Sequence, residues 1–192
     1  KAMAEHAIDI CIISGTDPHQ SELPPRHWRG REWLTGFESE NGTNGTAVVS
    51  DSDALCWTDS RYFIQAEDQL RDTGFKMMKE DGPEAVDLID WVVEHAAQGQ
   101  TVGIDGMTFS VDYARRLQDA LSAKGVTLNT DFPLFDFIYP DRPARPLNPL
   151  FVHDEKIVGQ SADEKIDAVL HQVELQGANA ILISALDDLA WI

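Results

Sequence analysis

The chain has 192 residues, which suits one or two domains, and 15 Lys and Arg against 33 Asp and Glu leave a formal net charge of −18. A charge of this size and sign repels nucleic-acid phosphates and anionic lipid surfaces, so we expect no nucleic acid and no membrane among the partners. Hydrophobic residues make up 43 % and charged residues 25 % of the chain. This composition is typical of a folded globular protein and excludes disorder over most of the length.

The first half of the chain is rich in predicted strands. An apolar run comes first, and a loop with three prolines follows it. Gly36 stands where a short helix commonly ends. The predicted elements are a strand at 8–14, a helix at 27–35, a polar surface loop at 38–44, and a hairpin of strands 46–50 and 54–58 across 51–53.

The next stretch alternates between predicted helices and strands. Apolar residues recur at spacings of three and four in two segments, as on the buried face of an amphipathic helix. The predicted elements are helices at 61–70, 84–97 and 111–123 and strands at 75–78, 101–104 and 126–128. Three early strands followed by alternating helices and strands indicate an α/β layered fold with a mixed sheet.

Two cysteines, Cys11 and Cys56, are too few for a disulfide framework. Both lie in apolar runs, where cysteine behaves as a small buried hydrophobic residue, so we expect two reduced thiols. Reduced thiols indicate the cytoplasm. The sequence shows no pattern of a secretory signal and no apolar run near the ~20 residues of a membrane span, which agrees with that location.

Residues 139–153 form a Pro-rich segment in which proline recurs at every third position, at Pro140, Pro143, Pro146 and Pro149. Three residues make one turn of a polyproline II helix, so these prolines share one edge of an extended chain. We interpret the segment as an interdomain linker that aromatic residues hold on a domain surface. A flexible linker is the alternative.

After the Pro-rich segment the first pattern begins again. A helix is predicted at 161–176 and a strand at 178–184. Ser184 and Asp187 follow Ser14 and Asp17 at the same interval of 170 positions, within similar apolar surroundings. We therefore expect one structural unit used twice. Because so short a second copy cannot bury a core, we expect the chain to be a fragment of a longer protein.

Common catalytic motifs are absent from the sequence, which contains no HExxH, GxSxG, Walker A or GxGxxG pattern. The loop at 17–22, DPHQSE, gathers metal-ligating residue types around His19. It has no second ligand pair at a motif spacing, so we favour a hydrogen-bonded loop histidine over a metal ligand. Two consecutive glycosylation sequons at 41–43 and 44–46 are interpreted as a turn, because no secretory signal accompanies them.

The segment 54–66 predicts a strand that runs into a helix, with Asp59 or Ser60 as the helix cap. Arg61 then falls in the first helical turn, where a cation faces the positive end of the helix dipole. One interpretation is a local ion pair with Asp59. The other is a guanidinium that binds a carboxylate or carbonyl of a substrate, since its planar fork orients such groups.

Five segments of the chain carry a family resemblance. They are IISGTDPHQSE at 12–22, REWLTGF at 31–37, GTAVV at 45–49, WTDSRYF at 57–63 and ALDDLAW at 185–191. In this order, over nearly the whole chain, they resemble the start of the cytosolic Xaa-Pro aminopeptidases (aminopeptidase P). The segment RPARP at 142–146 matches the Pro-rich connection of that family.

The resemblance implies a fold and a domain layout. Three-domain members have two creatinase-type N-terminal domains, each ribonuclease-H-like, followed by a pita-bread catalytic domain. We accordingly expect an α/β fold whose mixed β-sheet is flanked by helices. The expected layout is a creatinase-like domain at 1–138, a Pro-rich linker at 139–154 and the incomplete start of a second such domain at 155–192.

The resemblance also implies site residues. The arginine of the family's WTDGRYF motif contacts the peptide substrate and falls on Arg61, with Asp59 and His19 as supporting residues. The metal ligands of the family belong to the third domain, so we expect no metal and no catalytic residue here, and two divalent ions, Mn²⁺, in the catalytic domain. Two departures are Ser60 in place of the usual glycine and a loop lengthened by residues 38–41.

The function implied is the non-catalytic N-terminal part of a Xaa-Pro aminopeptidase, which removes the first residue from peptides with proline in second position. Such a region shapes substrate access, anchors the peptide and supports a homodimer, but is inactive by itself. Two alternatives remain. One is a protein-binding domain of a non-enzymatic, histone-chaperone type homologue, for which the charge suits a basic partner. The other is a creatinase-like amidinohydrolase, against which the repeat argues.

Overall fold

A computed structural model describes residues 1–39 and 45–192. The chain divides into two compact units, Lys1–Pro146 and Leu147–Ile192. The glycosylation sequons and the end of the polar loop predicted at 38–44 lie outside the described residues, apart from their flanks. Within the described residues no helix has the length and apolar character to cross a bilayer.

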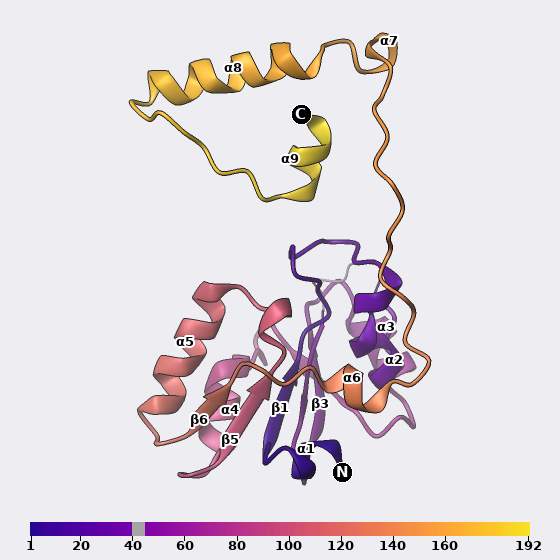
Figure 1. Cartoon of the computed structure of the whole chain (residues 1–192). Coiled ribbons are helices and arrows are strands. Elements are labelled where there is room, and N and C mark those ends of the chain that lie inside the picture. The colour runs from indigo at the N-terminus through magenta and orange to yellow at the C-terminus, as the bar shows by residue number, and fades with distance from the viewer. Residues whose placement is uncertain (40–44) are drawn as a thin grey trace. The chain divides into compact units, whose positions relative to one another are not determined.

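The first unit is built on one six-stranded mixed sheet with the strand order β4-β3-β2-β1-β5-β6 (Figure 1). Strand β1 pairs antiparallel with β2 and parallel with β5, and β3 pairs antiparallel with β2 and parallel with β4. The predicted α/β class and mixed sheet are confirmed. The strands are β1 Ile10–Ile13, β2 Thr46–Val49, β3 Ala54–Thr58, β4 Lys76–Lys79, β5 Thr101–Ile104 and β6 Thr127–Asn129.

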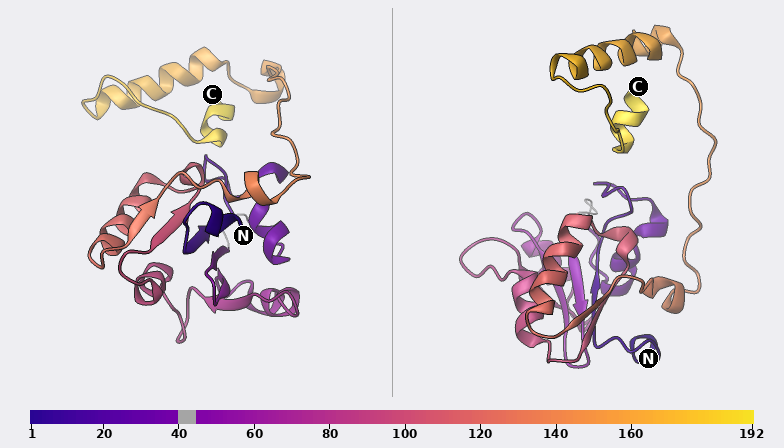
Figure 2. Two further views of the ribbon diagram at one scale, coloured as in Figure 1. Left: turned by 60° about the horizontal axis from the view of Figure 1, so that its bottom comes forward. Right: turned by 60° about the vertical axis from the view of Figure 1, so that its left-hand side comes forward.

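Helices cover both faces of this sheet, with α4 and α5 on one face and α1, α2, α3 and α6 on the other (Figures 1 and 2). The first unit contains α1 Ala2–Glu5, η1 Arg26–Trp28, α2 Gly30–Thr35, α3 Phe63–Gln69, α4 Leu88–His95, η2 Gly106–Thr108, α5 Val111–Ser122 and α6 Leu134–Ile138. Alternate residues of β1 enter opposite cores, with Ile10 and Ile12 facing one and Cys11 and Ile13 the other. A strand that is buried on both sides reads as an unbroken apolar run, which is why 8–14 shows no alternation.

Most of the element predictions for this unit are confirmed, but several helices begin later than their apolar spacing suggests. The helix predicted at 84–97 begins at Leu88, because the Asp87 carboxylate caps it by accepting the Asp90 N–H at 3.0 Å. The helix predicted at 27–35 divides into η1 and α2, and α2 ends at Gly36, whose φ is 77°. The predicted buried thiols are also confirmed, since Cys11 and Cys56 are both buried and free.

The second unit contains helices α7 Glu155–Val158, α8 Ala162–Leu175 and α9 Leu186–Trp191. Helix α8 is confirmed, and Ser161 and Glu164 close its N-terminus with a capping box. The strand predicted at 178–184 is wrong: this stretch is irregular. A strand needs a neighbour for its backbone hydrogen bonds, and the chain offers none in this unit. Helix α9 was not predicted.

Candidate functional site

The strongest sequence candidate, Arg61, lies in the turn between β3 and α3. The carboxylate of Asp59 accepts three hydrogen bonds from it: from the backbone N–H at 2.9 Å, from Nε at 3.0 Å and from Nη2 at 2.8 Å. The predicted local ion pair is thus confirmed. The side chain of Arg61 nevertheless stays 64 % exposed. The pair therefore presents a guanidinium of defined orientation at the carboxyl end of β3.

The predicted capping role of Asp59 and Ser60 is wrong. Helix α3 begins at Phe63, its N-cap is Tyr62, and no side chain caps it. The carboxylate oxygens of Asp59 accept hydrogen bonds from Arg61 and not from the N–H groups of the helix. Arg61 precedes the helix instead of lying in its first turn, so the prediction that its charge lies in the first turn, facing the positive end of the helix dipole, is also wrong.

Ser60, which departs from the family pattern, is held by the loop after β4. Its N–H and hydroxyl donate to the two carboxylate oxygens of Asp81, at 2.9 and 2.8 Å. Among the described residues, positive φ angles outside glycine occur at Ala7, Gln20 and Asp72 and not at Ser60. The serine at position 60 therefore causes no backbone strain, and its hydrogen bonds connect the turn after β3 to the loop after β4.

The charges around this turn influence one another. Hydrogen bonding to Arg61 lowers the pKa of Asp59, and the same bond raises the pKa of Arg61. Burial raises the pKa of Glu80, and the neighbouring carboxylates of Asp59 and Asp81 add to this effect. The surroundings of Arg61 are thus acidic, and its guanidinium stays charged.

His19 lies on the loop after β1. The buried carboxylate of Asp17 accepts the backbone N–H groups of His19 and Ser21, at 2.9 and 3.0 Å, while the His19 side chain is exposed. The loop is hydrogen-bonded as predicted, but through the histidine backbone and not its ring. Within the described part of the chain no hydrogen bond joins His19 to Asp59 or Arg61, and no group of three or more His, Cys, Asp or Glu is placed to hold a metal ion.

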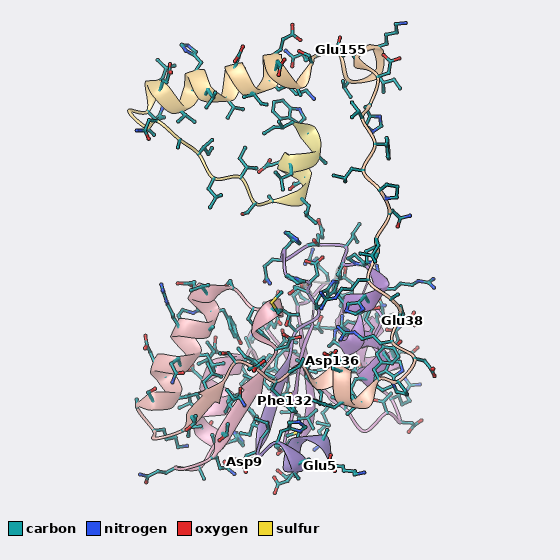
Figure 3. The ribbon with its side chains drawn as sticks, viewed as in Figure 1. Glu5, Asp9, Glu38, Phe132, Asp136 and Glu155 are labelled. Carbon is teal, nitrogen blue, oxygen red and sulfur yellow. The ribbon has the colours of Figure 1, made fainter. Side chains whose placement is uncertain are left out.

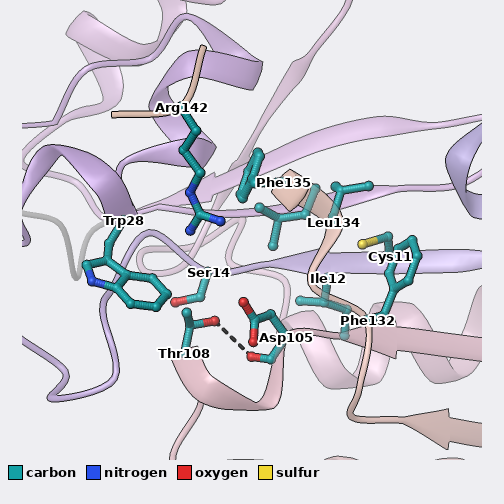
Figure 4. A pocket seen from close by; sticks show the side chains of 11 residues that line it. Cys11, Ile12, Ser14, Trp28, Asp105, Thr108, Phe132, Leu134, Phe135 and Arg142 are labelled. Atoms are coloured by element: carbon teal, nitrogen blue, oxygen red, sulfur yellow. Dashed lines mark hydrogen bonds between the residues drawn. The ribbon is translucent and has the colours of Figure 1, made fainter. Parts of the chain in front are cut away.

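Sequence reasoning missed a pocket at the carboxyl ends of β1 and β5, in which a few polar and charged side chains lie among mostly apolar ones (Figure 4). Ser14 follows β1, while Asp105 follows β5 and caps η2 by accepting the Met107 N–H at 3.1 Å. Trp28 and Arg142 line the same pocket from η1 and from the Pro-rich segment. The signal was present, because an aspartate directly after a buried strand is a common site residue in α/β folds.

Comparison with known proteins gives two matches to family models. A model described as the Creatinase/Prolidase N-terminal domain matches residues 1–131, and a second model with this description matches residues 141–192. The second match covers the region in which the sequence repeat was found.

Curated relatives match along nearly the whole chain. The probable Xaa-Pro aminopeptidase P of Aspergillus flavus is 37 % identical over 99 % of this chain and 29 % of its own length. Aminopeptidase P2 of Arabidopsis thaliana is 36 % identical over 96 % of this chain and 26 % of its own length. The chain thus spans less than a third of the length of these relatives.

A solved structure matches as well. The crystal structure of X-prolyl aminopeptidase from Caenorhabditis elegans, described as a cytosolic enzyme with a di-nuclear active site, gives a TM-score of 0.84 at 29 % sequence identity. The match covers 96 % of this chain and 30 % of that one. The fold and the sequence therefore point to the same group of proteins.

Proposed function

Because this chain belongs to the creatinase/prolidase N-terminal domain family, we propose that it is the non-catalytic N-terminal part of a metal-dependent Xaa-Pro aminopeptidase. Such an enzyme removes the first residue from peptides that have proline in second position. The support is the similarity to Xaa-Pro aminopeptidases of fungi and plants over almost every residue of the chain. The peptide bond before proline lacks an N–H, so a peptidase that binds extended backbone through N–H groups fails on it, and a dedicated enzyme is needed.

In this proposal the two divalent ions, Mn²⁺, belong to a catalytic domain outside the chain. The described residues do not fit a metal ion, since they form no group of three or more His, Cys, Asp or Glu. We therefore place no step of the reaction on a metal held here. The di-nuclear active site of the Caenorhabditis elegans enzyme supports the proposed number of two metal ions.

The role proposed for this chain is to anchor the peptide and to limit what reaches the active site. Arg61 carries the proposal, because its guanidinium is exposed while Asp59 fixes its orientation. A fixed guanidinium binds a peptide carbonyl or carboxylate without first losing the freedom of a flexible side chain. His19, exposed on the loop after β1, is proposed as a supporting residue.

The layout and setting are proposed on the same basis. A creatinase-like domain occupies 1–138, a Pro-rich linker 139–154, and the start of a second such domain 155–192. The whole enzyme is a cytosolic homodimer, in which the N-terminal domains border the active site.

Replacement of Arg61 tests the peptide-binding role in the whole enzyme. Arg61→Ala is expected to lower kcat/KM for Xaa-Pro peptides roughly tenfold or more, because a hydrogen bond to a charged group is lost. Metal content should not change, which plasma emission spectroscopy measures. Arg71→Ala is the matched control: Arg71 is 66 % exposed and pairs with Asp68 at 3.1 Å. Equal kcat/KM values for the two variants exclude Arg61 from the site.

The isolated chain tests the absence of catalysis. Purified residues 1–192 should release no amino acid from a Xaa-Pro peptide in the presence of Mn²⁺, because the metal-binding residues lie elsewhere. Turnover that scales with the amount of chain and is abolished by a chelator contradicts the proposal.

A second candidate is a protein-binding domain of histone-chaperone type, favoured by the net charge of −18. A pull-down with histones separates the candidates. Retention of histones at physiological salt, together with an inactive whole protein, favours the second. The similarity of the whole chain to named aminopeptidases supports the first.

A further inference from the structure

The first half of the Pro-rich segment is attached to the first unit around one tryptophan. The guanidinium carbons of Arg142 and Arg145 lie 5.3 and 5.1 Å from the centre of the Trp28 ring. Guanidinium groups at this distance from an indole face are attracted by its π-electrons. Two arginines three positions apart in the segment thus meet a single aromatic side chain from η1.

Hydrogen bonds to the neighbouring His27 add to this attachment. The backbone carbonyl of His27 accepts a hydrogen bond from Arg142 Nε at 2.8 Å. The Nδ1 atom of the His27 ring lies 2.7 Å from the carbonyl oxygen of Pro143. The ring Nε2 lies 3.4 Å from Arg145 Nε. Proline has no N–H, so its carbonyl is the backbone group by which such a segment is held.

Aromatic packing continues the attachment toward α6. The ring of Tyr139 stacks on Trp33 with a centroid distance of 4.1 Å and an interplanar angle of 12°. The ring of Phe135 lies against Gly30, where an added Cβ would be 2.3 Å from a ring carbon. Helix α2 therefore carries a glycine at the point where α6 approaches it. Figure 3 labels Phe132, which precedes α6, and Asp136, which lies on α6. The carboxylate of Asp136 accepts a hydrogen bond from Arg142 Nη1 at 2.7 Å.

Arg142 also closes the pocket at the carboxyl ends of β1 and β5. The chain leaves these two parallel strands toward opposite faces of the sheet, and such a crevice is where open α/β sheets commonly bind ligands. In Figure 4 the guanidinium of Arg142 points into the pocket, opposite the carboxylate of Asp105. Burial raises the pKa of Asp105, and the positive charges of Arg142 and Arg145 act in the opposite direction.

The space that remains in this pocket is small. The cavity measures about 20 Å³, room for about one water molecule. Arg142 therefore fills the innermost part of the crevice, beside β1. A larger and more open hollow of about 670 Å³ adjoins it and is lined by Trp28, Asp105, Arg142 and Arg145 among others.

The attachment ends sharply at Pro146, where the first unit ends. Leu147 is 90 % exposed and Leu150 and Phe151 are also largely exposed, although all three are apolar. The Pro-rich segment is thus divided: residues 139–146, the attached half, belong to the first unit, and the residues that follow belong to the second.

We propose that residues 139–146, the attached half, are a rigid extension of the first unit that sets the direction in which the chain leaves it. Trp28 is the main attachment point, and Arg142 inserts into the crevice between β1 and β5. The freedom of the chain between the two units then begins at Leu147 and not at Tyr139. This inference does not rest on the proposed enzymatic role.

The rigidity of residues 139–146 is tested by measuring the distance between two spin labels in the chain of residues 1–192. Asp119→Cys on α5 and Leu147→Cys provide exposed labelling sites, and the native Cys11 and Cys56 are buried. Electron–electron double resonance should give a single narrow distance distribution. Trp28→Ala should cause loss of the narrow peak in favour of a broad distribution.

Control variants separate release of the segment from unfolding. Arg142→Gln with Arg145→Gln removes both guanidinium groups, and with them the ion pair of Arg142 with Asp136 at 2.7 Å, and should also broaden the distribution. Thermal unfolding of this variant checks that the first unit stays folded. Arg116→Gln removes a guanidinium that lies 5.8 Å from the Tyr113 ring on α5 and should leave the distribution narrow. A broad distribution in the parent chain overturns the proposal. A narrow distance distribution in both the Trp28 variant and the double arginine variant also overturns the proposal.

Discussion

Arg61 and Asp59 show how much geometry two residues can set when a turn lies between them. The backbone N–H and the guanidinium of Arg61 bind the same carboxylate, so the side chain and the turn hold each other in place. Ser60 ties that turn to Asp81. The result is a charged group that is exposed and oriented, which is the combination a peptide-binding residue needs.

The Asp59 carboxylate should respond to the loss of its partner. Arg61→Ala is expected to raise the pKa of Asp59, because the hydrogen bonds that favour its charged form are removed. Since the folded pKa is the lower one, the stability from this pair is present above the ordinary carboxyl range and is lost as pH falls through the folded pKa. Carbon NMR titration of the carboxyl group measures the shift. An unchanged pKa of Asp59 in the Arg61→Ala variant contradicts the hydrogen bond between the two side chains.

The two thiols should be inert and should make the fold sensitive to alkali. Burial raises the pKa of Cys11 to about 12 and that of Cys56 to about 11, from 9.0. Their contribution to stability is therefore present below pH 9 and declines as pH rises toward these values, by about 1 kcal/mol per pH unit for each thiol. Denaturant unfolding between pH 8 and 10.5 measures the decline.

The double variant Cys11→Ala with Cys56→Ala is the control for this prediction and should show a shallower dependence on pH. At pH 8 the native protein should not react with iodoacetamide, whereas the denatured chain should react at both cysteines. Rapid labelling of the native protein contradicts the burial of the thiols.

At the scale of elements, α2 is bounded by two glycines that serve different purposes. Gly30 gives the ring of Phe135 access to the helix, and Gly36 ends the helix with a φ of 77°. The sequence indicates the second purpose, because a glycine after a helical stretch is a familiar terminator. The first depends on a side chain more than a hundred positions away.

Gly30→Ala is expected to lower the free energy of unfolding by about 1–3 kcal/mol, although alanine is the better helix former. The reason is that the new Cβ would lie 2.3 Å from a ring carbon of Phe135. Thermal and denaturant unfolding measure the loss. Combined with Phe135→Ala, which opens the space, the substitution should cost less than in the parent chain. If the effects of Gly30→Ala and Phe135→Ala on the free energy of unfolding are additive, the contact between these two residues is contradicted.

Gly36→Ala provides a comparison on the same helix. It should cost about 1 kcal/mol through the left-handed backbone, independently of Phe135. A double-mutant cycle between Gly36→Ala and Phe135→Ala should therefore be additive.

At the scale of the whole molecule, the two units differ in what supports them. The first has apolar cores on both faces of its sheet. In residues 147–192, all of which the structure describes, Lys165 is the only buried residue, and its ammonium donates to the carbonyl of Trp191. A unit without an apolar core gains little hydrophobic stabilisation, and a helix the length of α8 is marginal in water by itself.

Hydrogen exchange should reveal this difference. The amides of α8 are expected to exchange much faster than those of β1 and β5, because opening α8 exposes almost no buried surface. Mass spectrometry of the intact chain measures both in one sample. Ser161→Ala should accelerate exchange in α8 further by removing the capping box, and should leave the sheet unaffected. Equal protection of α8 and the central strands contradicts this picture.

The sequence by itself determined the local features of this protein: the apolar strands of the first unit, the helix ends at Gly36 and Ser161, and the buried thiols. It also offered the Asp59–Arg61 pair as one of two interpretations of Arg61. Each depends on residues that are close in the chain or on an apolar pattern that forces burial. Tertiary structure alone decided that Asp105 and Arg142 face each other across a pocket and that Trp28 holds the Pro-rich segment. It also decided that 178–184 remains without strand structure, because a strand exists only where another strand meets its backbone groups.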